Sequence, residues 1–158
     1  MPLLEDGRLV VDHWASVADG PLPEGAVIVS PARLAEAAPR NAPLGVSIGN
    51  DVQVDTLAPW LPRLALVQVT LPKSKDGRAF SQIRALREYH GFRGEIRVAG
   101  HVIPDHYAML LRCGASTVVV PEGSDPAVWR AARRVVSIAY QHAQSAEQPL
   151  ALLRRRVA

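Results

Sequence analysis

Short apolar runs rich in β-branched residues alternate along the chain with segments that have the apolar spacing of helices. In one such unit, the run Leu64–Leu71 (LALVQVTL) precedes a segment from Phe80 to Tyr89 with apolar residues three positions apart. This alternation is typical of βα units, in which a helix crosses over between two parallel strands. Since such crossovers are right-handed in nearly all proteins, the pattern predicts a parallel sheet packed against helices.

Residues that end strands and begin helices set the expected boundaries. Ser30-Pro31 and Asp125-Pro126 begin helices, because Ser and Asp cap helix N-termini and Pro is tolerated at the first helical position. Gly91 and Gly94 end a helix and make a turn. Helices are therefore expected at residues 31–38, 54–60, 78–89, 104–111 and 126–144. Strands are expected at residues 9–14, 26–30, 44–49, 64–71, 95–99 and 117–120.

The expected fold is α/β, a single domain of βα repeats over residues 1–147 followed by a basic C-terminal tail at 148–158. Residues 96–120 read strand, Gly, helix, Gly-Ala, strand, which resembles the late units of phosphate-binding TIM barrels. Because 158 residues are too few for a full barrel, an open doubly wound sheet and a partial TIM-like barrel both stay open. In either case we expect a mainly parallel five-stranded sheet built from residues 26–30, 44–49, 65–71, 95–99 and 117–120.

Composition and charge limit the classes of protein to which the chain can belong. Nearly half of the residues are apolar, and the net charge of +3 is a mild excess that suits a small anion or a polyanionic partner. The sequence shows neither an N-terminal signal pattern nor an apolar run long enough to span a membrane, so we expect a soluble cytoplasmic protein without a membrane partner. Arg130, Arg133 and Arg134 share one face of the last helix, but no aromatic platform accompanies them, and we expect no nucleic-acid partner.

A basic loop follows the strand at 64–71 and leads into the next helix. Lys73, Lys75 and Arg78 lie there, at the carboxyl end of a strand and the N-terminus of a helix. Sheets of parallel strands bind ligands at that edge, and a helix N-terminus offers free N–H groups with a partial positive charge. The loop is therefore a candidate site for sulfite, sulfate or a phosphate group. The alternative is a solvated loop in which Arg78 pairs with Asp76 or Glu95.

Three further residues are candidates for the same site. Arg97 lies inside a strand, so if it points inward it needs a partner. A structural ion pair with Asp105 is favoured, and a shared role with Arg78 in binding the anion is the alternative. His101 near a strand end could act as a general acid, with Asp105 as structural support.

Neither a metal nor a redox cofactor is expected. His101, Asp105 and His106 do not have the spacing of a metal site. Cys113 is the one cysteine, which rules out an internal disulfide, and we interpret it as a structural residue at the end of a helix. One thiol cannot hold an iron–sulfur cluster, and the chain has no Gly-x-Gly-x-x-Gly fingerprint for a dinucleotide.

From about Val69 onward, several segments together resemble one bacterial family. They are Asp76–Ser81 (DGRAFS), Leu86–Glu88 (LRE), Gly91–Gly100 (GFRGEIRVAG), Val102, Asp105 and Arg112–Gly114 (RCG), with weaker similarity back to Leu44–Val46 and Asp51. The family is DUF934, whose members are usually described as oxidoreductases involved in sulfite reduction. The chain departs from the family pattern at His106 and Ala115, where members commonly carry a glutamine and an aromatic residue.

The resemblance implies a place in sulfur assimilation and cysteine biosynthesis, with sulfite reductase as a partner. It brings no catalytic residue, and no redox motif accompanies it, so whether the protein is an enzyme stays open. The leading hypothesis is an accessory protein of assimilatory sulfite reduction that binds a small oxyanion or docks on the reductase. The alternatives are a small enzyme acting on a sulfur- or phosphate-containing metabolite and a non-catalytic interaction module. Homo-oligomerisation also stays open.

Overall fold

A computed structural model describes residues 1–135, 143 and 144 of the 158-residue chain. The described residues form four α-helices, three short 3-10 turns and one sheet of eight strands. The strands are β1 (Leu3–Glu5), β2 (Arg8–Val10), β3 (Ala15–Val17), β4 (Val27–Val29), β5 (Leu44–Ile48), β6 (Leu66–Leu71), β7 (Glu95–Gly100) and β8 (Thr117–Val119). The helical segments are η1 (Pro31–Arg33), α1 (Leu34–Ala37), η2 (Val54–Leu57), η3 (Leu61–Arg63), α2 (Arg78–Glu88), α3 (Pro104–Cys113) and α4 (Pro126–Arg134).

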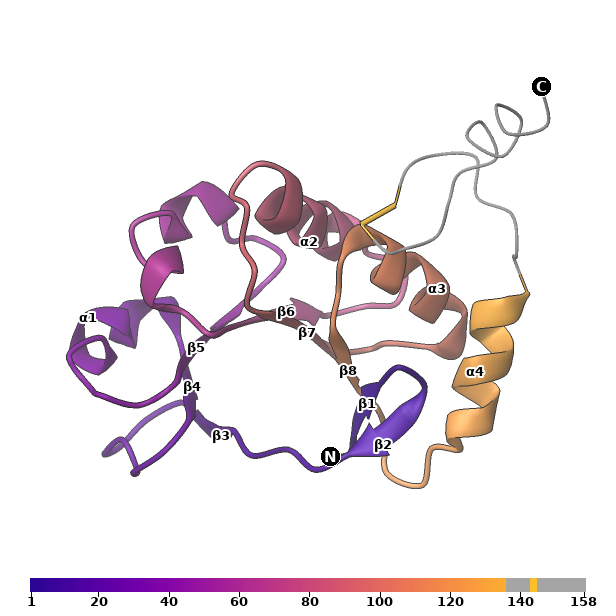
Figure 1. Cartoon of the computed structure of the whole chain (residues 1–158), viewed down its shortest axis with the longest axis horizontal. Coiled ribbons are helices and arrows are strands. Elements are labelled where there is room, and N and C mark those ends of the chain that lie inside the picture. Colours follow the sequence, from indigo (N-terminus) through magenta and orange to yellow (C-terminus); the bar gives the residue numbers. More distant parts are fainter. Residues whose placement is uncertain (136–142, 145–158) are drawn as a thin grey trace.

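The strand order puts the helices on one side of the sheet. From β3 to β8 the strands are neighbours in chain order, and each pair is parallel. Because every right-handed crossover steps in the same direction, the helices between these strands must all cover the same face. Figure 1 shows α1, α2 and α3 along the outer side of the curved sheet. The main hydrophobic core fills the space between that face and the helices.

A short connection forces the sheet to curl. The strands β2 and β3 are the two edges of the sheet, yet only residues 11–14 connect them. Five residue steps from Val10 to Ala15 span at most about 18 Å. A flat sheet of this order would hold its edge strands about 34 Å apart. The sheet is therefore rolled into a half-barrel, with the connection running between its two edges (Figure 1).

The inner face of the half-barrel has a small core of its own. Ile28 and Leu66 are buried there, apart from the main core, and they flank Gly45 in the register of β4, β5 and β6. A Cβ atom on Gly45 would lie 3.1 Å from Leu66 Cδ2 and 3.2 Å from Ile28 Cγ1. The tight curl therefore leaves little room for a side chain at the centre of β5.

An ion pair between the exposed Asp12 and a buried arginine fastens the connection to this inner face. Arg97 on β7 is only 2% exposed, and its Nη1 donates to Asp12 Oδ2 at 2.8 Å. Its Nε donates to Glu95 Oε1 at 3.1 Å, and the Thr117 hydroxyl donates to the same oxygen at 2.6 Å. The other oxygen of Asp12 accepts from the backbone N–H of Trp14 at 3.1 Å. Asp12 thus both shapes the connection and holds it against the sheet.

The structure corrects the prediction for Arg97. The favoured pair of Arg97 with Asp105 is wrong, because Arg97 points to the inner face and binds Asp12 and Glu95. Asp105 is exposed in the first turn of α3, which covers the outer face.

The predicted five-stranded sheet is also wrong, although the α/β class holds. The five expected segments do pair in parallel as β4 to β8, but β3 and an N-terminal hairpin extend the sheet to eight strands of mixed direction. The expected strand at 9–14 ends at Val10. Asp6 and Gly7, with positive φ values of 46° and 75°, turn the chain back between β1 and β2.

The last expected elements are only partly described. The helix α4 begins at Pro126 as predicted and ends at Arg134. Residues 136–142 and the predicted tail at 148–158 lie outside the described part of the chain. Within the described part, no helix is long and apolar enough to cross a membrane.

The contact between Asp12 and Arg97 can be tested by stability measurements. Changing Asp12→Asn keeps the shape of the side chain but removes its negative charge beside a buried guanidinium. We expect the free energy of unfolding in urea to fall by about 1.5–3 kcal/mol, the range for a hydrogen bond to a charged group. The control is Glu24→Gln, an exposed carboxylate without an ion pair in the described residues. Equal stability of the two variants would contradict the role given to Asp12.

Candidate functional site

The carboxyl ends of β5, β6 and β7 meet at one edge of the sheet. The loops that leave them carry Asn50 after β5, Lys73 and Lys75 after β6, and His101 after β7. Arg78 is the first residue of α2, which follows the β6 loop. In barrels and parallel sheets, ligands bind at this edge. The structure therefore brings four of the predicted site residues to the expected end of the strands.

A glycine requirement brings His101 close to the β6 loop. Gly100 has a φ of +100°, and a Cβ atom there would lie 2.3 Å from the carbonyl oxygen of Leu71. Only glycine avoids this clash. The close approach lets the backbone N–H of His101 donate to that same oxygen at 2.8 Å. The loops after β6 and β7 thus leave the sheet side by side.

Asp76 ties the β6 loop to its neighbours. Its carboxylate accepts from Arg78 Nε at 3.0 Å, from Arg78 Nη2 at 2.7 Å and from the backbone N–H of Arg78 at 3.2 Å. The side-chain amide of Asn50 also donates to it. The hydrogen bonds from Arg78, the largest influence, hold the pKa of Asp76 at about 2, below its ordinary value. Of the partners considered for Arg78, the structure selects Asp76.

A buried glutamine holds the loop after β5, which carries Asn50. Gln82 on α2 donates through Nε2 to the carbonyl oxygens of Gly49 at 2.8 Å and Val52 at 2.9 Å. It holds the loop that presents Asn50. The sequence analysis missed Gln82, although a signal existed. It shares the buried face of α2 with Ala79, Ile83 and Leu86, where a polar residue needs partners.

The positively charged side chains at this edge differ in whether a negative charge lies beside them. Arg78 is neutralised by Asp76, although its side chain is 63% exposed. Lys73 and Lys75 are exposed, and neither ammonium group has a hydrogen bond or an ion pair within the described residues. They are also the only lysines in the whole sequence, which otherwise uses arginine for its positive charge. The uncompensated positive charge of the edge thus comes from these two side chains.

Arg97 does not join this group. It lies three residues before Gly100, inside the half-barrel, with both of its carboxylate partners beside it. Asp105 and His106 lie in the first turn of α3, where the His106 ring contacts Phe80 edge-on with 5.7 Å between centroids. The predicted anion-binding set is therefore divided between the edge and the interior.

Neither Cys113 nor a metal cluster adds chemistry to the edge. Burial raises the pKa of the Cys113 thiol above its ordinary value, and the nearby arginines only partly oppose this. The thiol is therefore protonated at neutral pH and weakly reactive. In residues 1–135, 143 and 144, no three His, Cys, Asp or Glu side chains gather in a way that could hold a metal ion.

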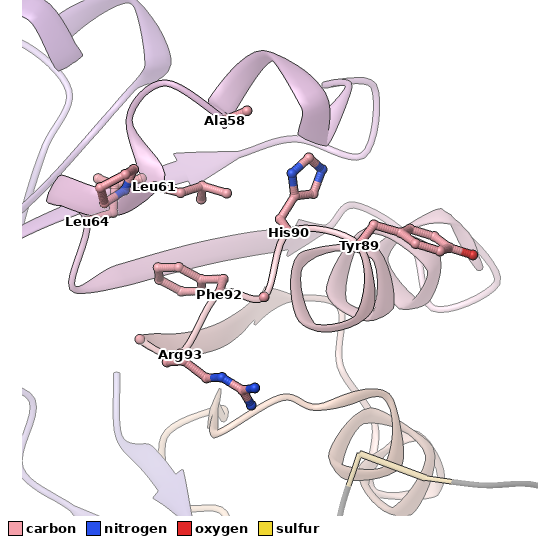
Figure 2. Close-up of a pocket in the computed structure, with 10 residues that line it drawn as sticks. Ala58, Leu61, Leu64, Tyr89, His90, Phe92 and Arg93 are labelled. Atoms are coloured by element: carbon pink, nitrogen blue, oxygen red, sulfur yellow. The ribbon is translucent and has the colours of Figure 1, made fainter.

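A mainly apolar pocket lies at the opposite end of the strands. It has a volume of about 550 Å³ and is formed by η3 and the loop between α2 and β7. Figure 2 shows Leu61, Leu64 and Phe92 on one side of it, with Tyr89 pointing away from it. His90 is mostly buried beside this pocket, and its Nε2 lies 2.9 Å from Asp55 Oδ1. None of the predicted site residues lines this pocket.

A comparison with protein families identifies the family of the chain. The family described as "Bacterial protein of unknown function (DUF934)" matches residues 45–151, which is more than half of the 158 residues. The chain belongs to the DUF934 family. The match begins in β5 and includes the whole carboxyl edge of this DUF934 protein, whereas Asp12 and the N-terminal hairpin precede it. No curated protein matches the chain.

The depressed pKa of Asp76 predicts a pH dependence of stability. A folded-state pKa of about 2, against an ordinary 3.8, means that the ionised carboxylate stabilises the fold above about pH 4. That contribution is lost as the pH falls toward 2. Urea unfolding of the wild type and of Asp76→Asn should show a gap in stability at pH 5–7 that closes between about pH 4 and pH 2.

The exposed Glu122→Gln variant is the control for this measurement, because Glu122 has no ion pair in the described residues. A gap between wild type and Asp76→Asn that persists unchanged to pH 2 would show that the carboxylate does not act through its charge.

Proposed function

We propose that this DUF934 protein is an accessory protein of assimilatory sulfite reduction that binds a small oxyanion at the carboxyl edge of its sheet. One observation carries the proposal. The ammonium groups of the two lysines have no partner among the described residues, and they lie in a loop that Asp76 fastens to the neighbouring loop through Asn50. A fixed loop with free ammonium groups supports binding of a compact oxyanion such as sulfite, sulfate or phosphate. The resemblance to a family described in connection with sulfite reduction supports the choice of process.

The residues favour an accessory role over independent electron transfer. The one thiol of the chain is held protonated by burial, and a single cysteine cannot ligate an iron–sulfur cluster by itself. None of the βα junctions has the glycine-rich sequence of a dinucleotide site. His101 beside the lysine loop favours the second candidate, a small enzyme that protonates a sulfur- or phosphate-containing metabolite.

The two lysines predict a specific response to oxyanions. Sulfite, sulfate or phosphate should raise the melting temperature of the wild type more than chloride of equal ionic strength, because a ligand of the folded state stabilises it. The double variant Lys73→Gln with Lys75→Gln should lose that rise. The control is Arg134→Gln, which removes an exposed cation from α4, away from this edge.

Because the sequence has no other lysine, amine-selective acetylation can follow the site directly. Mass spectrometry should show slower acetylation of Lys73 and Lys75 when the oxyanion is present. Unchanged acetylation rates at an anion concentration that saturates the thermal response would rule out this edge as the binding site.

The accessory role predicts an effect that needs the reductase. Added to purified sulfite reductase, the protein should change the assembly or the turnover of that enzyme, and the lysine double variant should change it less. Alone, it should neither turn over sulfite nor oxidise a reduced nicotinamide. Sulfite turnover by the pure protein, or a stoichiometric flavin or haem in it, would contradict the accessory role and favour the enzyme.

A further inference from the structure

A second pocket opens at the amino end of the parallel strands, opposite the lysine loop. It has a volume of about 560 Å³. Its lining comes from the loops before β7 and β8, from the end of β1 and the turn after it, and from Arg87 of α2, Leu111 of α3, Arg133 of α4 and Gln144. The strand β1 contributes here because it is antiparallel to β8, so its carboxyl end lies beside the amino end of β8.

One wall of this pocket is built around Arg87. Its guanidinium donates to the carbonyl oxygens of Phe92 at 2.6 Å, Gly94 at 2.8 Å and Gly114 at 2.9 Å, and to the Ser116 hydroxyl at 3.1 Å. All of these acceptors are neutral, and no carboxylate pairs with Arg87 in the described part of the chain. Arg87 therefore fixes both loops while its charge stays uncompensated.

A second arginine adds to this positive wall. Arg93 is exposed in the same pocket, with no hydrogen bond or ion pair among the described residues. Burial, and then the charge of Arg93, lower the pKa of Arg87. Two like charges held near each other repel, and an anion bound between them would relieve that repulsion. The Ser116 hydroxyl beside Arg87 can take part in the same contact.

The opposite wall carries negative charge. Glu5 pairs with Thr117 across the ladder of β1 and β8, so Asp6 lies next to Ser116, about one strand spacing of 4.8 Å away. Arg133 also lines the pocket, and its Nη1 approaches Asp6 Oδ1 at 3.7 Å, whereas the side chain of Glu5 has no hydrogen bond or ion pair among the residues described.

This negative wall is fixed by the helices behind it. The Tyr107 hydroxyl accepts from the backbone N–H of Gly7 at 2.8 Å, and Arg130 donates to the carbonyl oxygen of Gly7 at 2.8 Å. Tyr107 is fully buried and packs edge-on against Trp129. The hairpin turn that carries Asp6 is thus held at a set distance from the arginine wall.

We propose that this pocket binds a small zwitterion of the α-amino acid class. Its carboxylate contacts Arg87, Arg93 and the Ser116 hydroxyl, and its ammonium group faces Glu5 and Asp6. The ammonium and carboxylate groups of an α-amino acid are bonded to the same carbon atom, so its two charges lie close together, which suits walls of opposite charge one strand spacing apart. The lining carries three arginines and two carboxylates, so it offers partners to both charged groups of a zwitterion. Leu111 and Ala115 leave an apolar side for the ligand's side chain.

The experiment titrates the full chain with each of the common amino acids, followed by thermal shift and calorimetry. For the best of them, the analogues without the amino group and without the carboxyl group are tested as well. We expect at least one amino acid to bind with a Kd below about 1 mM, and each analogue to bind at least about tenfold more weakly. Arg93→Gln should weaken binding by at least about tenfold, because Arg93 is free to contact the ligand and supports no other residue.

Three further variants test where the ligand binds. Glu5→Gln should reduce the preference for the amino acid over its analogue without the amino group. Arg134→Gln and the double variant at Lys73 and Lys75 should bind as the wild type does, which separates this pocket from the proposed oxyanion site. The proposal is overturned by no binding of any amino acid at about 10 mM, by equal binding of the analogue without the amino group, or by unchanged binding in Arg93→Gln.

Discussion

The four-residue connection between the edge strands is the constraint on which the rest of the structure depends. Residues 11–14 cannot span a flat sheet of eight strands, so the sheet must roll up. Rolling narrows the inner face until only a few side chains fit there, which is why Gly45 lies between Ile28 and Leu66. It also brings Asp12 over Arg97, which gives a buried guanidinium the partner that burial demands. Curl and ion pair therefore require each other.

The parallel part of the fold could be predicted because its signals are local. Each strand from β4 to β8 is a short apolar run, and the starts of η1 and α4 carry residues that favour helix starts. The hairpin was missed even though Asp6-Gly7 between two apolar segments is a strong turn signal. The partner of Arg97 could not be predicted, because Asp12 lies 85 positions away and meets it only once the sheet has curled.

The same distinction applies to the candidate sites. Sequence position was enough to place Lys73, Lys75 and His101 at the carboxyl edge, since each follows a recognisable strand. The support from Asn50 and Gln82 depends on which loops become neighbours, and strand order supplies that only in the structure. The arginine pocket was missed for a related reason. Arg87 and Arg93 belong to one αβ junction, from α2 to β7, but their opposing carboxylates come from the end of β1 and the turn after it.

The place of β1 in the sheet has a consequence for how the chain folds during synthesis. The strand β1 pairs with β8, the last strand of the described residues, so the hairpin can join the sheet only after more than a hundred further residues have been made. Contacts this far apart in sequence slow folding and leave strand edges unpaired in the meantime. The unfinished half-barrel exposes the free edge of β1 until residues 117–119 arrive. Completion of the sheet, and with it of both walls of the arginine pocket, thus waits until β8 has been made.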